Sequence, residues 1–131
     1  MKNSSASAGR VLVVEDEPSI SQVCLRVLTG EGFEVDIAEN GASAQNRLKE
    51  KDYDVCLIDI MTPVMDGKQL YRWIRVKHPK MLKGVIFTTG DAIKPDTRSF
   101  LERASRPFLP KPFTLDELKT VVRETLRQAG K

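Results

Sequence analysis

Five polar residues of the sequence are of types that could together bind a metal ion and a phosphoryl group. Glu15 and Asp16 follow one short apolar run, and Asp59 follows another. Thr89 closes a third run, and Lys111 follows a short segment flanked by prolines. Three carboxylates brought within a few ångströms repel one another by roughly several kcal/mol at an effective dielectric near 20. A hard divalent cation would offset this repulsion. Oxygen ligands without histidine or cysteine favour Mg²⁺ over zinc, and a lysine could bind a phosphoryl oxygen.

Five apolar runs of strand length, each followed by a helical pattern, would position these residues. The predicted strands are residues 11–14, 33–37, 55–58, 85–87 and 107–110. The predicted helices begin at Pro18, near Ala42, shortly before Leu70, at Pro95 and at a capping box opened by Thr114. Alternation of strand and helix predicts a parallel sheet covered by helices on both faces.

The composition of the strands predicts their order in the sheet. Residues 11–14, 55–58 and 85–87 are uniformly apolar, as expected for central strands buried on both faces. Residues 33–37 alternate between apolar and polar, and residues 107–110 have a proline at each end. Both features are typical of edge strands. The predicted fold class is therefore α/β, a doubly wound five-stranded parallel sheet in the order 2-1-3-4-5.

This order brings the polar residues to one edge of the sheet. In open α/β sheets, ligands bind at the carboxyl ends of the strands, beside the point where the strand order reverses. Taken singly, each residue has a structural explanation. Acids before Pro18 favour the start of a helix, and Asp59 and Thr89 are typical of turns. A lysine such as Lys111 is commonly solvated. Their shared position at the ends of successive strands favours a common site.

Length and composition are those of a single domain. The chain has 131 residues, 40% hydrophobic and 30% charged, so it can bury a core. Residues 1–9 are predicted to be a flexible lead-in, and residues 10–129 the domain. No apolar run is long enough to span a bilayer and no secretory signal is recognised, so we expect a cytoplasmic protein that does not contact a membrane. A net charge of +3 with scattered basic residues gives no reason to expect direct binding of nucleic acid.

Four short motifs resemble those of the receiver domain of bacterial two-component response regulators. They are Glu15-Asp16, the segment Asp59-Ile-Met-Thr-Pro-Val-Met-Asp-Gly67, Thr89-Gly90 and Lys111-Pro-Phe113. The resemblance extends from Arg10 to the last helix, and it implies a flavodoxin-like (βα)5 fold. The stretch from Thr89 to Phe113 is similar to receivers attached to hybrid sensor histidine kinases. The sequence departs from the usual pattern at Glu15, where aspartate is commoner, and at Thr62, where methionine is frequent.

The resemblance implies a phosphorylation site. Asp59 would accept a phosphoryl group from a phosphohistidine, or from a small donor such as acetyl phosphate. Mg²⁺ would be bound by Asp16, by Asp59 and by the backbone carbonyl of Met61, with Glu15 acting through water. Lys111 would bind the phosphoryl group and form an ion pair with it.

The resemblance also implies a switch. Thr89 would turn its hydroxyl onto the phosphoryl group, and Phe108 would turn inward in response. This movement would remodel the face formed by the fourth helix, the fifth strand and the fifth helix, which could support a homodimer. The Lys111-Pro112 peptide bond would be cis, an isomer tolerated only before proline.

The implied role is that of a phospho-acceptor and not of an enzyme, although the domain would assist its own phosphorylation and dephosphorylation. Its partners would be a sensor histidine kinase or a histidine phosphotransfer domain. A haloacid-dehalogenase phosphatase is excluded, because that class needs a second aspartate two residues after the first, where Met61 stands. A degenerate receiver that only binds partners stays open. A nucleic-acid-binding regulator would need an output domain, which the sequence up to Lys131 does not include. Both a free-standing regulator and a receiver that is part of a larger protein stay open.

Overall fold

Five parallel strands form the central sheet of a computed structural model that describes residues 7–90 and 94–130. The strands are β2 (Gly9–Val14), β3 (Phe33–Ala38), β4 (Val55–Asp59), β5 (Val85–Thr89) and β6 (Phe108–Pro110). Their order is β3-β2-β4-β5-β6, and every pairing is parallel. The predicted order is confirmed, with the alternating strand at one edge and the proline-flanked strand at the other.

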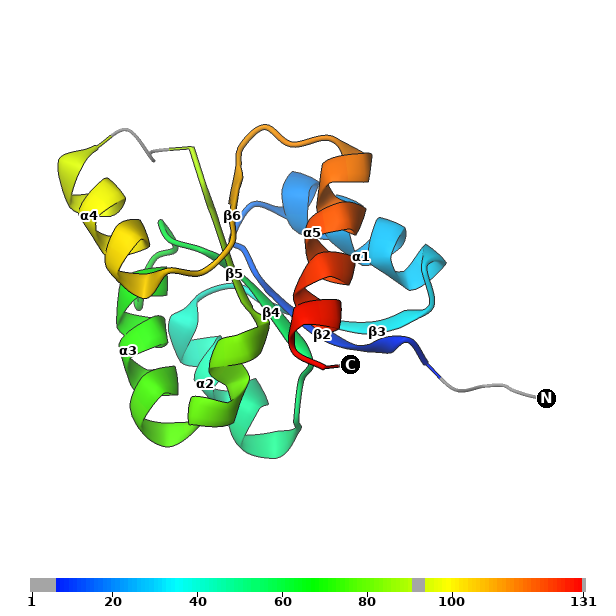
Figure 1. Cartoon of the computed structure of the whole chain (residues 1–131), viewed down its shortest axis with the longest axis horizontal. Coiled ribbons are helices and arrows are strands. Elements are labelled where there is room, and N and C mark those ends of the chain that lie inside the picture. The colour runs from blue at the N-terminus through cyan, green and yellow to red at the C-terminus, as the bar shows by residue number, and fades with distance from the viewer. Residues whose placement is uncertain (1–6, 91–93, 131) are drawn as a thin grey trace.

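Helices cover both faces of the sheet (Figure 1). They are α1 (Pro18–Gly30), α2 (Gly41–Glu50), α3 (Gly67–Lys77), α4 (Pro95–Ala104) and α5 (Leu115–Gln128), with a 3₁₀ helix η1 (Pro79–Gly84) between α3 and β5. Helices α1 and α5 lie on one face, and α2, α3 and α4 lie on the other (Figure 1). The sequence did not predict η1, because so short a turn shows no hydrophobic periodicity. Among the described residues, no helix is both long enough and apolar enough to cross a bilayer.

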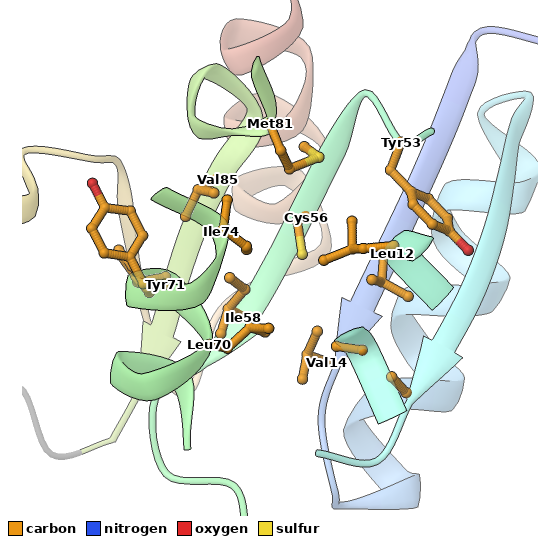
Figure 2. Packing of buried hydrophobic residues seen from close by; sticks show 14 of the residues in the cluster. Leu12, Val14, Tyr53, Cys56, Ile58, Leu70, Tyr71, Ile74, Met81 and Val85 are labelled. Atoms are coloured by element: carbon orange, nitrogen blue, oxygen red, sulfur yellow. The ribbon is translucent and has the colours of Figure 1, made fainter. Parts of the chain in front are cut away.

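The sheet divides the core into two layers because side chains alternate along each strand. Leu12 and Val14 of β2 pack on the side of α2 and α3 (Figure 2), whereas Val11 and Val13 pack on the side of α1 and α5. Cys24 and Cys56 lie inside these layers, and both are buried and free. Both faces of the central strands are therefore buried, which holds their ends in fixed relative positions.

The N-terminal residues meet the sheet slightly earlier than the sequence suggests. Strand β2 begins at Gly9, and the amide of Ala8 donates a hydrogen bond to the carbonyl of Gly32, 2.9 Å away. Residues 1–6, most of the predicted lead-in, lie outside the described residues.

Helices α3 and α5 begin with capping boxes. Asp66 and Gln69 form a capping box at the start of α3, and Thr114 and Glu117 form the predicted one at the start of α5. Gly67 is required where it stands, because a Cβ there would lie 2.8 Å from the Cα of Ile60. Its amide donates to the Ile60 carbonyl, 3.0 Å away, and this contact ties the start of α3 to the end of β4.

Val64 stands in a strained backbone conformation in the loop between β4 and α3. Its φ is 67°, and the residue is 84% exposed, so packing does not compensate for the strain. A left-handed conformation costs a β-branched residue about 1–2 kcal/mol, whereas asparagine adopts it more readily. We expect Val64→Asn to raise the free energy of unfolding by about 1 kcal/mol in urea denaturation. Val76→Asn is the control, because Val76 is 75% exposed within α3; an equal gain there would show that strain is not the cause.

Candidate functional site

The polar residues singled out from the sequence meet at the carboxyl ends of the strands. Glu15 and Asp16 directly follow β2, Asp59 ends β4, and Thr89 ends β5. Lys111 directly follows β6. Strand β2 lies between β3 and β4 and is the point where the strand order reverses, so the edge is the expected location of a ligand site in this kind of sheet.

Lys111 connects the carboxylates of the site. Its Nζ donates a hydrogen bond to Oδ2 of Asp59 at 2.9 Å and lies 2.8 Å from Oε1 of Glu15 in an ion pair. A third, longer contact of 3.4 Å reaches Oε1 of Glu17. The backbone amide of Lys111 donates to the carbonyl of Thr89 at 3.2 Å, which fixes the lysine beside the end of β5. The peptide bond between Lys111 and Pro112 is cis, as the resemblance implies.

Glu17 was not singled out by sequence reasoning. Its carboxylate is more than half exposed and makes the weakest of the lysine contacts. Glu17 could have been identified from its position in the sequence, because it directly follows the acidic pair and forms the N-cap of α1. Its backbone amide also donates to Oε2 of Glu15 at 3.1 Å, so this residue helps to orient the buried acid.

Burial and charge shift the pKa values of the two central groups. Burial raises the pKa of the Glu15 carboxyl to about 7, the Lys111 contact opposes this rise, and the negative charge of Asp59 adds to it. Burial by itself lowers the pKa of Lys111, but the hydrogen bonds and charges of Glu15 and Asp59 outweigh it and hold that pKa above its ordinary value. Lys111 is therefore charged at neutral pH, and the carboxylates of Glu15 and Asp59 share its positive charge.

An all-oxygen donor set lies beside the lysine. One carboxylate oxygen from each of Glu15, Asp16 and Asp59 lies within 4.8 Å of the others. Glu15 and Asp59 are each 3% exposed, while Asp16 is exposed and opens the cluster to solvent. Oδ1 of Asp59 accepts a hydrogen bond from the amide of Met61 at 3.0 Å, which places the start of the next loop against the carboxylate. This donor set fits a hard divalent cation such as Mg²⁺ and suits zinc poorly.

The structure thus brings together Glu15, Asp16, Asp59, Met61 and Lys111. The carboxylate of Glu15 is buried and contacts Lys111 directly, and its role toward a metal ion through water stays a prediction. The loop that carries Met61 is held by Thr62, whose hydroxyl donates to the carbonyl of Met65 at 2.9 Å. Thr62, one of the departures from the usual pattern, therefore has a structural role of its own.

The two predicted switch residues lie on neighbouring strands. Thr89 is buried at the end of β5, and Phe108 begins β6 opposite Phe87. Phe108 is half-buried and packs against the core layer that contains Phe87. Thr89 pairs with Pro110 and Phe108 pairs with Phe87, so the two residues lie two register positions apart on adjacent strands. The movement itself stays a prediction.

The chain is similar to proteins of the response regulator family. The family model of the response regulator receiver domain matches residues 11–123. The uncharacterized transcriptional regulatory protein YkoG of Bacillus subtilis is 34% identical over 122 residues, which are 93% of this chain and 53% of that protein. The sensor kinase CckA of Brucella abortus is 34% identical over 125 residues, 94% of this chain and 13% of that protein.

Among solved structures, the CheY-like response regulator receiver domain protein of Methanospirillum hungatei JF-1 superposes with a TM-score of 0.86. It is 26% identical, and the match covers 95% of this chain and 98% of that one. The chain spans about half or less of the length of the two curated relatives. The family match over most of the chain, the shared fold and the cluster around Lys111 agree, and the chain belongs to the response regulator receiver domain family.

Proposed function

We propose that this receiver domain accepts a phosphoryl group on Asp59 in a reaction that depends on Mg²⁺. The observation that carries the proposal is the contact of one lysine with the buried carboxylates of Glu15 and Asp59. Such a lysine offsets the negative charge of these carboxylates and would bind the incoming phosphoryl oxygens. Proteins of this family work in two-component signalling, and their phosphoryl donors are histidine kinases.

The proposed transfer moves the phosphoryl group from nitrogen to oxygen. An oxygen of Asp59 attacks the phosphorus of a phosphohistidine, the phosphorus–nitrogen bond breaks with its electron pair leaving on the imidazole, and an acyl phosphate forms. Lys111 follows the developing negative charge from the carboxylate to the phosphoryl oxygens. Mg²⁺, held by Asp16, Asp59 and the carbonyl of Met61, would neutralise charge on the transferring group. The amide of Met61, already 3.0 Å from Oδ1 of Asp59, keeps the acceptor oriented.

The phosphorylated state would be read out at the face formed by α4, β6 and α5. Thr89 would bind the phosphoryl group and Phe108 would turn inward, so this face would change its shape and could form a homodimer. We propose a sensor histidine kinase or a histidine phosphotransfer domain as the donor, in the cytoplasm, without direct contact to nucleic acid. The domain would be a phospho-acceptor that assists its own phosphorylation and dephosphorylation. No observation on the described residues favours the alternative of a receiver that only binds partners.

Incubation of the chain with acetyl phosphate and Mg²⁺ tests the proposal. We expect an adduct of about 80 Da that is stable in acid and lost in alkali, as an acyl phosphate is. Removal of Mg²⁺ with a chelator should prevent its formation. If a histidine kinase that phosphorylates other receivers and the small donor both leave this chain unmodified, the phosphorylation proposal is wrong, although the fold and the family stand.

The raised pKa of Glu15, about 7, predicts that Mg²⁺ affinity depends on pH. Below pH 7 the carboxyl is protonated and must lose its proton when a cation binds, so affinity should fall by up to about tenfold per pH unit and be nearly constant above pH 7. In the metal-free protein, the contribution of Glu15 to folding stability changes with pH in the opposite direction to the Mg²⁺ affinity. The folded state binds more protons than the unfolded state between pH 4.5 and about 7, so this group's contribution to stability decreases as pH rises through that range.

Isothermal titration calorimetry in buffers of different ionisation enthalpy measures the proton release directly. We expect the release of nearly one proton for each Mg²⁺ ion bound near pH 6, and of much less than one proton above pH 8. Glu15→Gln should bind Mg²⁺ more weakly and with little dependence on pH. An unchanged pH profile in that variant would assign the titration to another group.

A further inference from the structure

One segment of this chain is basic and lacks acidic residues. Residues 67–90, which contain α3 and η1, carry six lysines and arginines and neither aspartate nor glutamate. The rest of the chain holds 15 basic residues against 18 acidic ones, so it is net negative. The net charge of +3 is therefore the sum of one strongly cationic segment and a net negative remainder, so the basic residues are less evenly scattered than expected from the whole chain.

Three arginines of this surface surround one cleft. The cleft has a volume of about 290 Å³ and is lined by Arg72 and Arg75 of α3, by Arg103 of α4, and by Tyr71, Phe100 and Ala104. We call it the arginine cleft. Helices α3 and α4 are neighbours on the same face of the sheet (Figure 1), so residues far apart in the sequence meet here. All three arginines are exposed.

The floor of the arginine cleft is aromatic and rigid. Tyr71 is 8% exposed and Phe100 is 6% exposed, and their rings meet edge to face at 5.7 Å. Both rings also pack edge to face on Phe87 in the core, and Figure 2 shows Tyr71 at the edge of that core layer. Lys68 lies with its Nζ 5.9 Å from the centre of the Phe100 ring, which adds a fourth positive charge beside the cleft.

No internal acid balances these charges within the part of the chain that the structure describes. None of its ion pairs involves Arg72, Arg75 or Arg103. Arg75 and Arg103 stand in the last turns of their helices, where a positive charge interacts favourably with the helix dipole and stabilises the helix. Arg72 stands mid-helix and lacks that benefit, and it lies four residues after Lys68, a like-charge spacing that destabilises a helix. The charge of Arg72 is therefore not explained by the stability of the domain.

We propose that the arginine cleft binds an acidic segment of a partner protein. The planar guanidinium groups match carboxylates in paired hydrogen bonds, and the cleft has room for one or two side chains. Val76 lies one helical turn beyond Arg72 and is 75% exposed, so an apolar residue next to the acids would also find a contact. The proposal does not depend on Asp59, because no residue of the phosphorylation site lines the cleft.

A nucleic acid fits this surface less well. A phosphodiester backbone continues beyond any single cleft, and across α4 it would meet the exposed carboxylates of Asp96 and Glu102. A second copy of this chain is also a weaker candidate. Glu124, an acid of the exposed face of α5, already pairs with Arg127 at 3.1 Å.

The test uses the whole chain and a fluorescent probe peptide of glutamate and aspartate with two leucines. We expect anisotropy to show binding, and amide shifts in NMR spectra to map it to α3 and α4. Arg72→Glu with Arg75→Glu should lower the affinity by at least about tenfold, and Arg103→Glu alone should lower it severalfold. Arg26→Glu with Lys49→Glu is the matched control. Both of these residues are exposed on other helices, and the change in net charge is the same.

Three outcomes would overturn the proposal. Equal loss of binding in the two double variants would show that only net charge matters. Tighter binding of a single-stranded oligonucleotide of the same charge, with the same dependence on Arg72 and Arg75, would assign the cleft to nucleic acid. Self-association of the chain that the Arg72 and Arg75 variant abolishes, without binding of the peptide, would assign it to a second copy. Circular dichroism of each variant confirms that the fold is intact in these comparisons.

Discussion

Asp59→Asn is expected to reduce phosphorylation by at least about a hundredfold, because it removes the nucleophilic oxygen while keeping the shape of the side chain. In the wild-type protein the backbone amide of Met61 donates a hydrogen bond to Oδ1 of Asp59, and the side-chain oxygen of asparagine can still accept it. Lys111 keeps its contact with Glu15, so the site should not collapse. Intact-mass spectrometry after incubation with acetyl phosphate and Mg²⁺ measures the effect.

A second readout separates loss of the acceptor from loss of the fold. The charge of Asp59 raises the pKa of Glu15, so the Asp59→Asn variant should show a lower pKa for Glu15 in an NMR titration. Asp96→Asn is the control, since Asp96 is an exposed acid in the first turn of α4 and should be phosphorylation-neutral. Full phosphorylation of the Asp59→Asn variant would transfer the acceptor role to another acid, with Asp16 the first to examine.

The order of the strands and the positions of the site residues follow from local sequence patterns. Residues 33–37 alternate because β3 is an edge strand, while residues 55–58 are uniformly apolar because β4 is covered on both faces. Once the order is known, Asp59 and Lys111 must lie at the same edge, since the carboxyl ends of parallel strands share one side of a sheet. Only residue type and strand position are needed for this inference.

Features that depend on side-chain reach or on loop conformation were not predictable. The contact of Glu17 with Lys111 requires two flexible side chains to meet across elements 94 positions apart. The positive φ of Val64 is set by the loop around it and contradicts the preference of its residue type. The arginine cleft is formed by residues of two helices that lie far apart in the sequence. The net charge of the whole chain does not reveal such a local cluster of positive charge.

Lys111→Met should separate the structural role of the lysine from its chemical role. Methionine keeps much of the length of the side chain and removes its charge, which leaves Glu15 and Asp59 buried side by side without a counterion. Breaking a buried ion pair in this way is costly, and we expect the metal-free variant to lose about 2–3 kcal/mol of stability at pH 8. Glu15 limits the loss by taking up a proton. Its pKa, already about 7, rises further when the opposing lysine contact is gone, so the destabilisation should shrink as pH falls to 6.

Mg²⁺ and phosphorylation should respond to this variant in opposite directions. Because no lysine has to be displaced from the carboxylates, we expect Mg²⁺ to bind at least about tenfold more tightly and to restore the lost stability. Phosphorylation should nevertheless fall by about a hundredfold or more, since the charge that would bind the phosphoryl oxygens is missing. Lys119→Met is the control, because its contact with Glu31 is long, at 3.9 Å, and Arg123 also pairs with Glu31, so its loss should cost less than about 1 kcal/mol. A Lys111→Met protein with unchanged metal affinity would mean that the lysine does not compete with the cation for these carboxylates, and the resting role assigned to Lys111 would have to be given up even if phosphorylation were lost.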